Sequence, residues 1–284
     1  MVLESLITPF KAEAGPKRMM LFGFIYCSVA IALAWTIFRA YASLLAVFLT
    51  TIACVPLMYN TMKMEEEKDL TDLEEKMLLK EHGKALRFFM YLFIGITLAV
   101  TLWYVVLPAE TASILFETQT STINAINSRV TGFASVQMSS FVRIFFNNVK
   151  VMVFCILFSF LYGAGAIFIL TWNASVIGTA IGNFIRQNLA LASDRLGLAQ
   201  AGYYFQIIAL GLFKYAIHGI PEILAYFTAG LAGGIISVAI IRHDFGTRKL
   251  EHILLDSADL ILLSIFLLFI AGLLEVWVTP VLFG

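Results

Sequence analysis

The sequence predicts an all-α fold, a polytopic helical membrane protein with about seven transmembrane helices and with broken or short helices in its C-terminal half. Of its 284 residues, 60% are hydrophobic and 13% are charged, whereas soluble domains average about 45–50% and about 25%. The mean hydropathy is +0.89. The apolar residues form unbroken runs of about 20 residues, which is the length of a membrane-spanning helix, and not the alternating segments of about ten residues that a transmembrane β-barrel requires.

Charge and motifs exclude several other classes of protein. Lys and Arg together number 19, as do Asp and Glu, so there is no net charge to attract nucleic acid, and we expect no nucleic-acid partner. The sequence has no phosphate-binding glycine loop, HExxH or GxSxG motif, and we expect no cofactor. Three cysteines without CxxC spacing lie in apolar runs and are expected to be buried thiols: Cys27, Cys54 and Cys155. Three histidines lie in polar segments and are expected at the surface: His82, His243 and His252.

Residues 1–140 are expected to form an N-terminal region with three spans. Apolar runs predict helices at about 19–38, 42–62 and 88–107, and Pro56 interrupts the second. The first run is longer than the apolar core of a cleaved signal peptide, which favours a retained helix.

Two polar segments lie between the spans. Residues 63–87 form a strongly charged block in which Leu70, Leu73 and Met77 recur at helical spacing. This pattern predicts a solvated amphipathic helix or hairpin that extends the second and third spans. Residues 109–147 are rich in Ser, Thr, Asn and Gln, and their apolar spacing predicts an amphipathic helix on the membrane or on a partner. Each segment is also a candidate docking site for a protein partner.

Residues 141–284 are expected to form a second membrane domain with four spans, at about 149–170, 203–217, 221–241 and 260–278. Asn173 is expected to cap a further helix at about 174–192, which contains Arg186. Because this helix is polar at its far end, we expect it to be interfacial or re-entrant. Whether 172–202 crosses the membrane decides the topology of everything that follows.

The positions of Lys and Arg predict the orientation. With the N-terminus in the cytoplasm, most of the 19 residues fall in cytoplasmic segments, Arg186 and Arg242 among them. Cytoplasmic loops carry such an excess of positive residues. The sequence therefore predicts a plasma-membrane protein with a cytoplasmic N-terminus and an external C-terminus.

His218 and Glu222 are expected at the apex of a helical hairpin. Gly219 suits the left-handed turn that ends one helix, and Pro221 suits the first position of the next. His218 then lies at a carbonyl-rich helix end and Glu222 at an amide-rich one, which favour a cation and an anion respectively. The turn would bring the two side chains close enough to pair or to share a ligand.

Glu275 is expected to approach this apex from the last span. It lies on the same predicted side of the membrane as Glu222 and at similar depth. Acidic residues inside spans cost roughly 2.5–3.5 kcal/mol and often mark functional sites. The alternative is that both glutamates cap helix ends at the membrane interface. Asn148 and Asn173 are expected to join the site if the fourth span packs alongside.

Small residues in the sixth span predict close packing against another helix. They recur every fourth residue and include a GxxxG motif: Ala225, Ala229, Gly230, Gly233, Gly234 and Ser237. The contact is expected either within the chain or across a homodimer interface.

Several motifs follow one another in the C-terminal half: Asn147-Asn148, Gly163-x-Gly165, Trp172-Asn173, His218-Gly219-Ile220-Pro221-Glu222 and Glu275 to Pro280. Over roughly residues 140–282 the chain resembles the stage II sporulation protein M family, and the HGxPE element before a Gly/Ala-rich span is the most specific part. The resemblance implies a helical membrane architecture. The sporulation member works with partners that degrade peptidoglycan during engulfment, but relatives occur in organisms that do not sporulate, so the resemblance implies no reaction.

Three functions are compatible with these residues. The leading hypothesis is a transporter- or channel-like protein in which a polar cavity binds a cation or small solute; its lining would be His218, Glu222, Glu275, Asn148 and Asn173. The alternative is a non-conducting membrane scaffold that organises envelope-remodelling partners. A weaker third hypothesis is an intramembrane metalloenzyme that uses His218, Glu222 and Glu275 as ligands.

Overall fold

The computed structural model describes residues 7–69, 75–130, 137–159, 164–190, 198–242 and 247–283. Within these ranges the chain is helical and has no strand. Seven of the described helices are long and apolar enough to cross a membrane. The prediction of an all-α, multi-span membrane protein is therefore confirmed.

The elements follow one another with short connections. In chain order they are α2 (Pro9–Ala14), α3 (Arg18–Ile37), η1 (Arg39–Tyr41), α4 (Ala42–Asp69), α5 (Glu75–Val106), α6 (Ala109–Leu115), α7 (Glu117–Val130), α8 (Gln137–Ser159), α9 (Ala164–Ala190), α10 (Leu198–Arg242), α11 (Arg248–Leu273), η2 (Leu274–Val278) and α12 (Thr279–Phe283). The η1 element is a 3₁₀ turn, and η2 is a π-helical turn.

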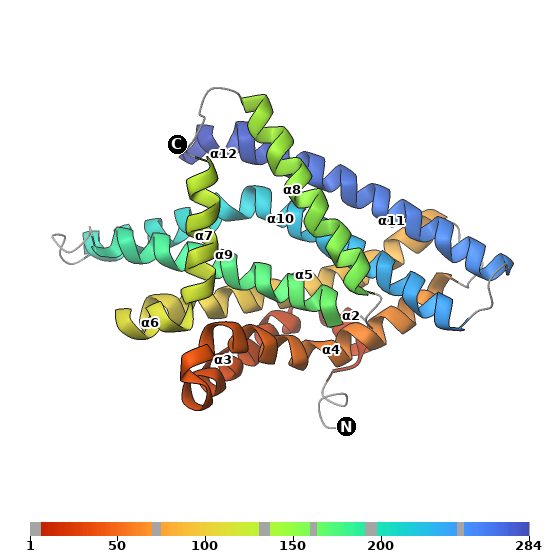
Figure 1. Cartoon of the computed structure of the whole chain (residues 1–284), viewed down its shortest axis with the longest axis horizontal. Coiled ribbons are helices and arrows are strands. Elements are labelled where there is room, and N and C mark those ends of the chain that lie inside the picture. The colour runs from red at the N-terminus through yellow and green to blue at the C-terminus, as the bar shows by residue number, and fades with distance from the viewer. Residues whose placement is uncertain are drawn as a thin grey trace.

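The long helices form one bundle with α10 near its centre (Figure 1). Helix α10 packs against α8, α9 and α11, while α5 packs against α3 and α9. Apolar side chains fill the space between them, and Phe89 of α5 stacks on Phe227 of α10 with ring centroids 5.5 Å apart. Helix α7 runs across this direction (Figure 1) and contacts α4 and α9.

Glycines allow the tightest helix contacts. A β-carbon at Gly23 of α3 would collide with the Leu92 carbonyl of α5, and one at Gly95 of α5 would collide with the Met20 carbonyl of α3. The two backbones can approach this closely only because both positions lack a side chain.

The small-residue stripe of α10 also packs inside the chain. A β-carbon at Gly233 would lie 2.8 Å from the Ile156 carbonyl oxygen of α8, and one at Gly234 would collide with Met62 of α4. The Ser159 hydroxyl donates a 2.8 Å hydrogen bond to the Gly230 carbonyl. Of the two alternatives for this stripe, the structure therefore shows the internal contact.

The charged block at 63–87 extends α4 and α5, but its acidic residues are not all solvated. Glu65 and Glu66 of α4 are 0% exposed. Lys68 donates to Glu65 at 2.8 Å, His82 Nδ1 lies 2.7 Å from Glu65 Oε2, and Arg242 donates to Glu66 at 2.7 Å. Buried carboxylates need such partners, because an unpaired charge away from water is costly.

Two details of the predicted surface change accordingly. The expectation that His82 lies at the surface is wrong, since it is 2% exposed, whereas His252 is exposed as expected. Leu70, Leu73, Gly163 and His243 lie outside the described residues.

The fourth predicted span, at 149–170, is wrong in its boundaries. Helix α8 ends at Ser159 and α9 begins at Ala164, so the run divides between two helices. Both helices are apolar, and hydropathy alone does not divide such a run between two helices that pack against each other. Asn173 lies within α9, not at a cap, and its Nδ2 donates to the Ile169 carbonyl at 2.8 Å.

The segment 174–192, expected to be interfacial or re-entrant, belongs in its described part to the longer helix α9. Residues Ala166–Leu189 form a helix long and apolar enough to span. The charged side chain near its far end, Arg186, donates to the carbonyls of Tyr104 and Leu107, at the end of α5. No backbone N–H group of α5 donates to these carbonyls, so they can accept hydrogen bonds from the positively charged guanidinium of Arg186.

The predicted hairpin at Gly219-Ile220-Pro221 is wrong, because α10 continues from Leu198 to Arg242 with Pro221 inside it. Proline and glycine are tolerated inside membrane helices, and a turn there would expose backbone polar groups to hydrocarbon. Proline still perturbs the helix, since it cannot donate to the carbonyl four residues earlier. Figure 1 shows that α10 changes direction near its middle.

These two corrections offset each other in the topology. Helix α9 adds a span and α10 removes one, so the number stays at seven. In Figure 1 the end of α4 and the start of α5, which carry the charged block, lie together with the end of α10 and the start of α11. Helix α6 lies at the opposite end of the bundle, with the end of α9 and the start of α10. Arg186 and Arg242 thus lie at opposite ends, and not on one side as predicted.

Candidate functional site

A polar cavity of about 290 Å³ lies between α8, α9, α10 and η2. Its lining residues are Arg143, Ile144, Asn147, Asn148, Val151, Asn173, His218, Glu222, Tyr226 and Glu275. The structure therefore brings the five polar residues proposed from the sequence around one cavity. They come from four separate elements, so the cavity exists only in the assembled bundle.

Helix α10 contributes three side chains at four-residue spacing. His218, Glu222 and Tyr226 lie on one face because residues four apart are neighbours on a helix surface. The Tyr226 hydroxyl donates a 2.9 Å hydrogen bond to Glu222 Oε1. Tyr226 is itself 1% exposed, so the packed ring holds the carboxylate in place.

The π-helical turn η2 contributes Glu275. The Thr279 hydroxyl donates to the Leu274 carbonyl, five residues earlier, at 3.0 Å. The same hydroxyl oxygen lies 3.3 Å from His218 Nδ1, which links the end of the chain to α10. Single π-helical turns are rare and occur frequently at functional sites, where they redirect a side chain.

Helices α8 and α9 complete the lining. Arg143 and Asn147 are four residues apart on α8, and Asn148 is a buried neighbour. Asn173 of α9 donates its Nδ2 to its own helix, so its carboxamide oxygen is the group left to accept a donor or a cation.

The lining holds more acidic than basic side chains. With both carboxylates ionised and His218 neutral, two glutamates face one arginine. None of the ion pairs formed between described residues involves Glu222 or Glu275. The volume is large enough for several waters, because one water occupies about 30 Å³ in the liquid. The cavity therefore suits a cation or a small positively charged solute.

Sequence reasoning did not single out Arg143, Asn147 or Tyr226 as members of the site. Helical spacing is the signal that finds two of them. Asn147 follows Arg143 by four residues and Tyr226 follows Glu222 by four, so each shares a helix face with a polar neighbour. For Arg143, the partner elements across the cavity are not visible in the sequence.

The predicted turn and packing residues of α10 lie outside the lining of the polar cavity. Gly219 and Pro221 lie within α10, where Gly219 faces an apolar groove. Gly230, Gly233 and Gly234 belong to the internal helix contacts. Among the described residues, no group of three or more His, Cys, Asp or Glu could hold a metal ion, so His218, Glu222 and Glu275 do not form one.

Comparison with protein families gives a match over most of the chain. The family model described as stage II sporulation protein M matches residues 44–280. The match contains the polar cavity and also reaches well before residue 140, into the helices of the N-terminal region. Neither the curated proteins nor the solved structures gave a match.

Proposed function

Since the chain belongs to the stage II sporulation protein M family and is a multi-pass membrane protein, we propose that it is transporter- or channel-like. Its polar cavity binds a cation or a small cationic solute inside the membrane. The main observation that supports this proposal is that Glu222 and Glu275 line one cavity together with asparagine side chains and a histidine.

The cost of placing these groups in the membrane supports this proposal. Ionisable residues in membrane helices are expensive, face bundle interiors or aqueous cavities, and mark ion and substrate pathways. A purely structural role requires polar side chains to satisfy one another, but here they surround a hollow of about 290 Å³. A perturbed α10 and a π-helical turn supply the side chains, as interrupted helices do in many transporters.

The chemistry of the lining suggests how the ligand is held. The carboxylates of Glu222 and Glu275 supply charge, and the carboxamides of Asn148 and Asn173 supply neutral oxygen atoms. Hard cations prefer such oxygen ligands. Tyr226 fixes one oxygen of Glu222, which leaves the other for the ligand. Arg143 limits the net negative charge, so a monovalent cation neutralises the lining.

We also propose that the N-terminus lies in the cytoplasm and the C-terminus outside the plasma membrane. The end of the bundle with α2 and the charged block carries many Lys residues, as cytoplasmic segments do. Moving Arg186 to the other end weakens this bias but does not reverse it.

The test is flux in proteoliposomes. The full chain is reconstituted, and uptake of protons, Na⁺, K⁺, Mg²⁺ and small organic ammonium ions is followed with internal dyes. We expect flux of at least one cation above that of empty liposomes. A folded, correctly inserted protein that moves none of them would overturn the proposal and favour the alternative, a non-conducting scaffold.

A further inference from the structure

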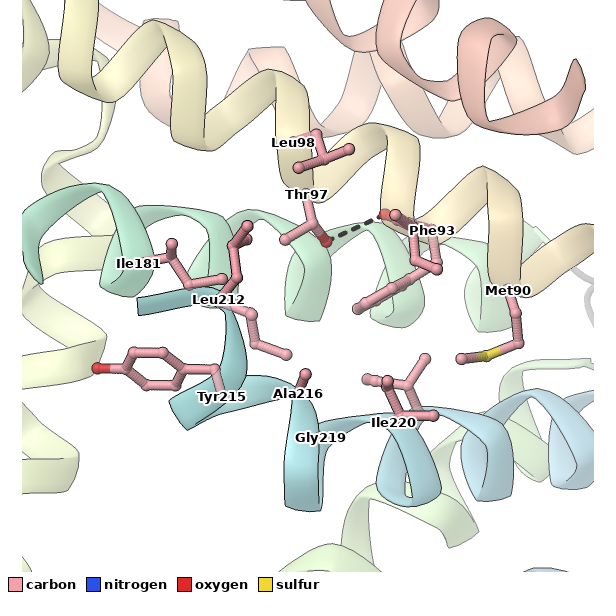
Figure 2. Close-up of a pocket in the computed structure, with 13 residues that line it drawn as sticks. Met90, Phe93, Thr97, Leu98, Ile181, Leu212, Tyr215, Ala216, Gly219 and Ile220 are labelled. Atoms are coloured by element: carbon pink, nitrogen blue, oxygen red, sulfur yellow. Dashed lines mark hydrogen bonds between the residues drawn. The ribbon is translucent and has the colours of Figure 1, made fainter. Parts of the chain in front are cut away.

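A second hollow lies on another face of α10. It has a volume of about 200 Å³ and is formed by α5, α9 and α10. Figure 2 shows Phe93 and Met90 of α5 at the right of the hollow, Ile181 of α9 and Leu212 of α10 at its left, and Ala216 and Gly219 of α10 below. We call it the apolar groove.

The apolar groove has almost no polar atoms to offer a ligand. Its lining side chains are aliphatic or aromatic apart from Thr97, whose hydroxyl donates to the Phe93 carbonyl at 3.0 Å (Figure 2). The Tyr215 hydroxyl points away from the hollow (Figure 2). Water without polar partners does not occupy such a space stably, and a polar ligand would lose its hydrogen bonds on entering.

The floor of the groove is a position without a side chain. A β-carbon built at Gly219 would meet no atom within 4 Å, so the space above this residue is open although the residue itself is buried. Glycine costs about 1 kcal/mol relative to alanine inside a helix. Here it keeps the hollow free, whereas Gly23 and Gly233 permit contact between backbones.

The groove lies where hydrocarbon is the solvent. All its lining residues belong to the candidate spans Met77–Val106, Ala166–Leu189 and Gly202–Arg242. Ile220 at its rim is 49% exposed, so the hollow communicates with the outer surface of the bundle. Lipid chains are the apolar molecules that surround such a surface, and they have no hydrogen-bonding atoms to satisfy.

We propose that the apolar groove binds one acyl chain of a membrane lipid, which lies over Gly219 between α5 and α10. The hollow accommodates a single flexible hydrocarbon chain, whereas a helix of a second copy would need a broader, flatter contact surface. The bound chain lies against the segment of α10 that carries His218 and Glu222. This inference goes beyond the proposed function and does not depend on it.

The test is photolabelling by lipid. The full chain is placed in nanodiscs with phosphatidylcholine that carries a diazirine in one acyl chain, irradiated, digested and mapped by mass spectrometry. In the wild-type protein we expect label concentrated on Ile220, Leu98 and Met90 relative to exposed positions such as Phe205 and Phe213.

A matched pair of glycine variants supplies the control. Gly219→Leu fills the hollow and should lower labelling at the groove severalfold, because the leucine side chain occupies the space of the acyl chain. Gly202→Leu lies in the same helix, also has open space around its β-carbon, and is outside the groove, so it should change nothing. Ala216→Leu fills the groove from a second position and should reproduce Gly219→Leu.

Three results would overturn the proposal. One is equal labelling of the groove and of Phe205 and Phe213 in the wild-type protein. Another is groove labelling that Gly219→Leu leaves unchanged while its melting temperature and elution volume match the wild type. The third is a disulfide between two copies of an Ile220→Cys variant under mild oxidation, which would assign the groove to a second copy.

Discussion

The hydroxyl of Tyr226 donates a 2.9 Å hydrogen bond to Oε1 of Glu222, one helical turn earlier on α10. Because the tyrosine ring is buried in the bundle, this bond holds the carboxylate in one position at the wall of the polar cavity. The carboxylate is thus preorganised before any ligand enters, and a ligand need not supply the energy to order it.

Replacing Glu222 should separate function from folding. Glu222→Gln keeps the shape and an oxygen that accepts from Tyr226 but removes the charge. We expect cation flux in proteoliposomes to fall to the level of empty liposomes, with a melting temperature close to the wild-type value. Glu275→Gln should act in the same direction.

Glu251→Gln is the matched control for these two variants. It removes one carboxylate from the exposed start of α11 and should leave the flux unchanged. Wild-type flux in Glu222→Gln and Glu275→Gln would show that the polar cavity is not the cation path.

Enlarging Gly233 should destabilise the bundle. A β-carbon there would lie 2.8 Å from the Ile156 carbonyl oxygen and 3.1 Å from the Ser159 β-carbon, and backbone atoms cannot rotate away. Gly233→Leu should cost about 1–3 kcal/mol or more, as overpacking does, and lower the melting temperature in detergent. Gly83→Leu in α5, which meets nothing within 4 Å, should melt like the wild type. Equal melting of both variants would argue against the α8–α10 contact.

Removing Arg242 should weaken the end of the bundle. Glu66 is buried and accepts from Arg242 at 2.7 Å, so Arg242→Met takes one cationic partner from a carboxylate that water does not reach. Arg242 is 34% exposed, so we expect a loss of about 1–3 kcal/mol in unfolding free energy, less than for a fully buried pair. Lys84→Met breaks an exposed ion pair with Glu81 and should change stability by less than about 0.5 kcal/mol. Equal melting temperatures for Arg242→Met and Lys84→Met would contradict the predicted contribution of the Arg242–Glu66 ion pair.

The orientation can be read by cysteine labelling. Glu75→Cys and Ala125→Cys, each in a chain whose three buried cysteines are replaced by alanine, lie at the start of α5 and within α7. We expect position 75 to react only after the inner membrane face is opened and position 125 to react from outside. Reaction of both from the same side would contradict the seven-span topology.

Composition is sufficient for the class of fold but not for the boundaries of the spans, and the predicted number of seven agrees only because two errors offset each other. Long apolar runs identify membrane helices because each must satisfy its backbone internally. The same property hides the division of one apolar run between α8 and α9, because both helices are apolar. The Gly219–Pro221 segment misled for a different reason. The rules that predict a turn at such a segment derive from soluble proteins, where water bonds to the backbone groups that a broken helix exposes. Hydrocarbon offers no such partner, so the helix continues.

The polar site was accessible from the sequence because charges in apolar runs stand out. His218, Glu222 and Glu275 are conspicuous in this way, and they do line one cavity. The i, i+4 relation of His218 and Glu222 on α10 places these two on one helix face, as the hairpin was expected to do, and η2 adds Glu275. Burial of Glu65 and Glu66 was not accessible, because it depends on partners such as Arg242, which lies 176 residues from Glu66 along the chain.

The π-helical turn has a consequence for changes in chain length. A π turn accommodates one residue more than the α-helix around it, and each residue of an α-helix advances the direction of the side chains by about 100°. Deleting one residue within Leu274–Val278 would remove this extra residue, so the helix would become regular while the residues after it kept nearly their present direction. Thr279 would then still face His218, its present neighbour at 3.3 Å. The same deletion in the regular part of α11 would turn Thr279 away from α10 by about 100°, so the effect of a change in chain length depends on whether it falls within this turn.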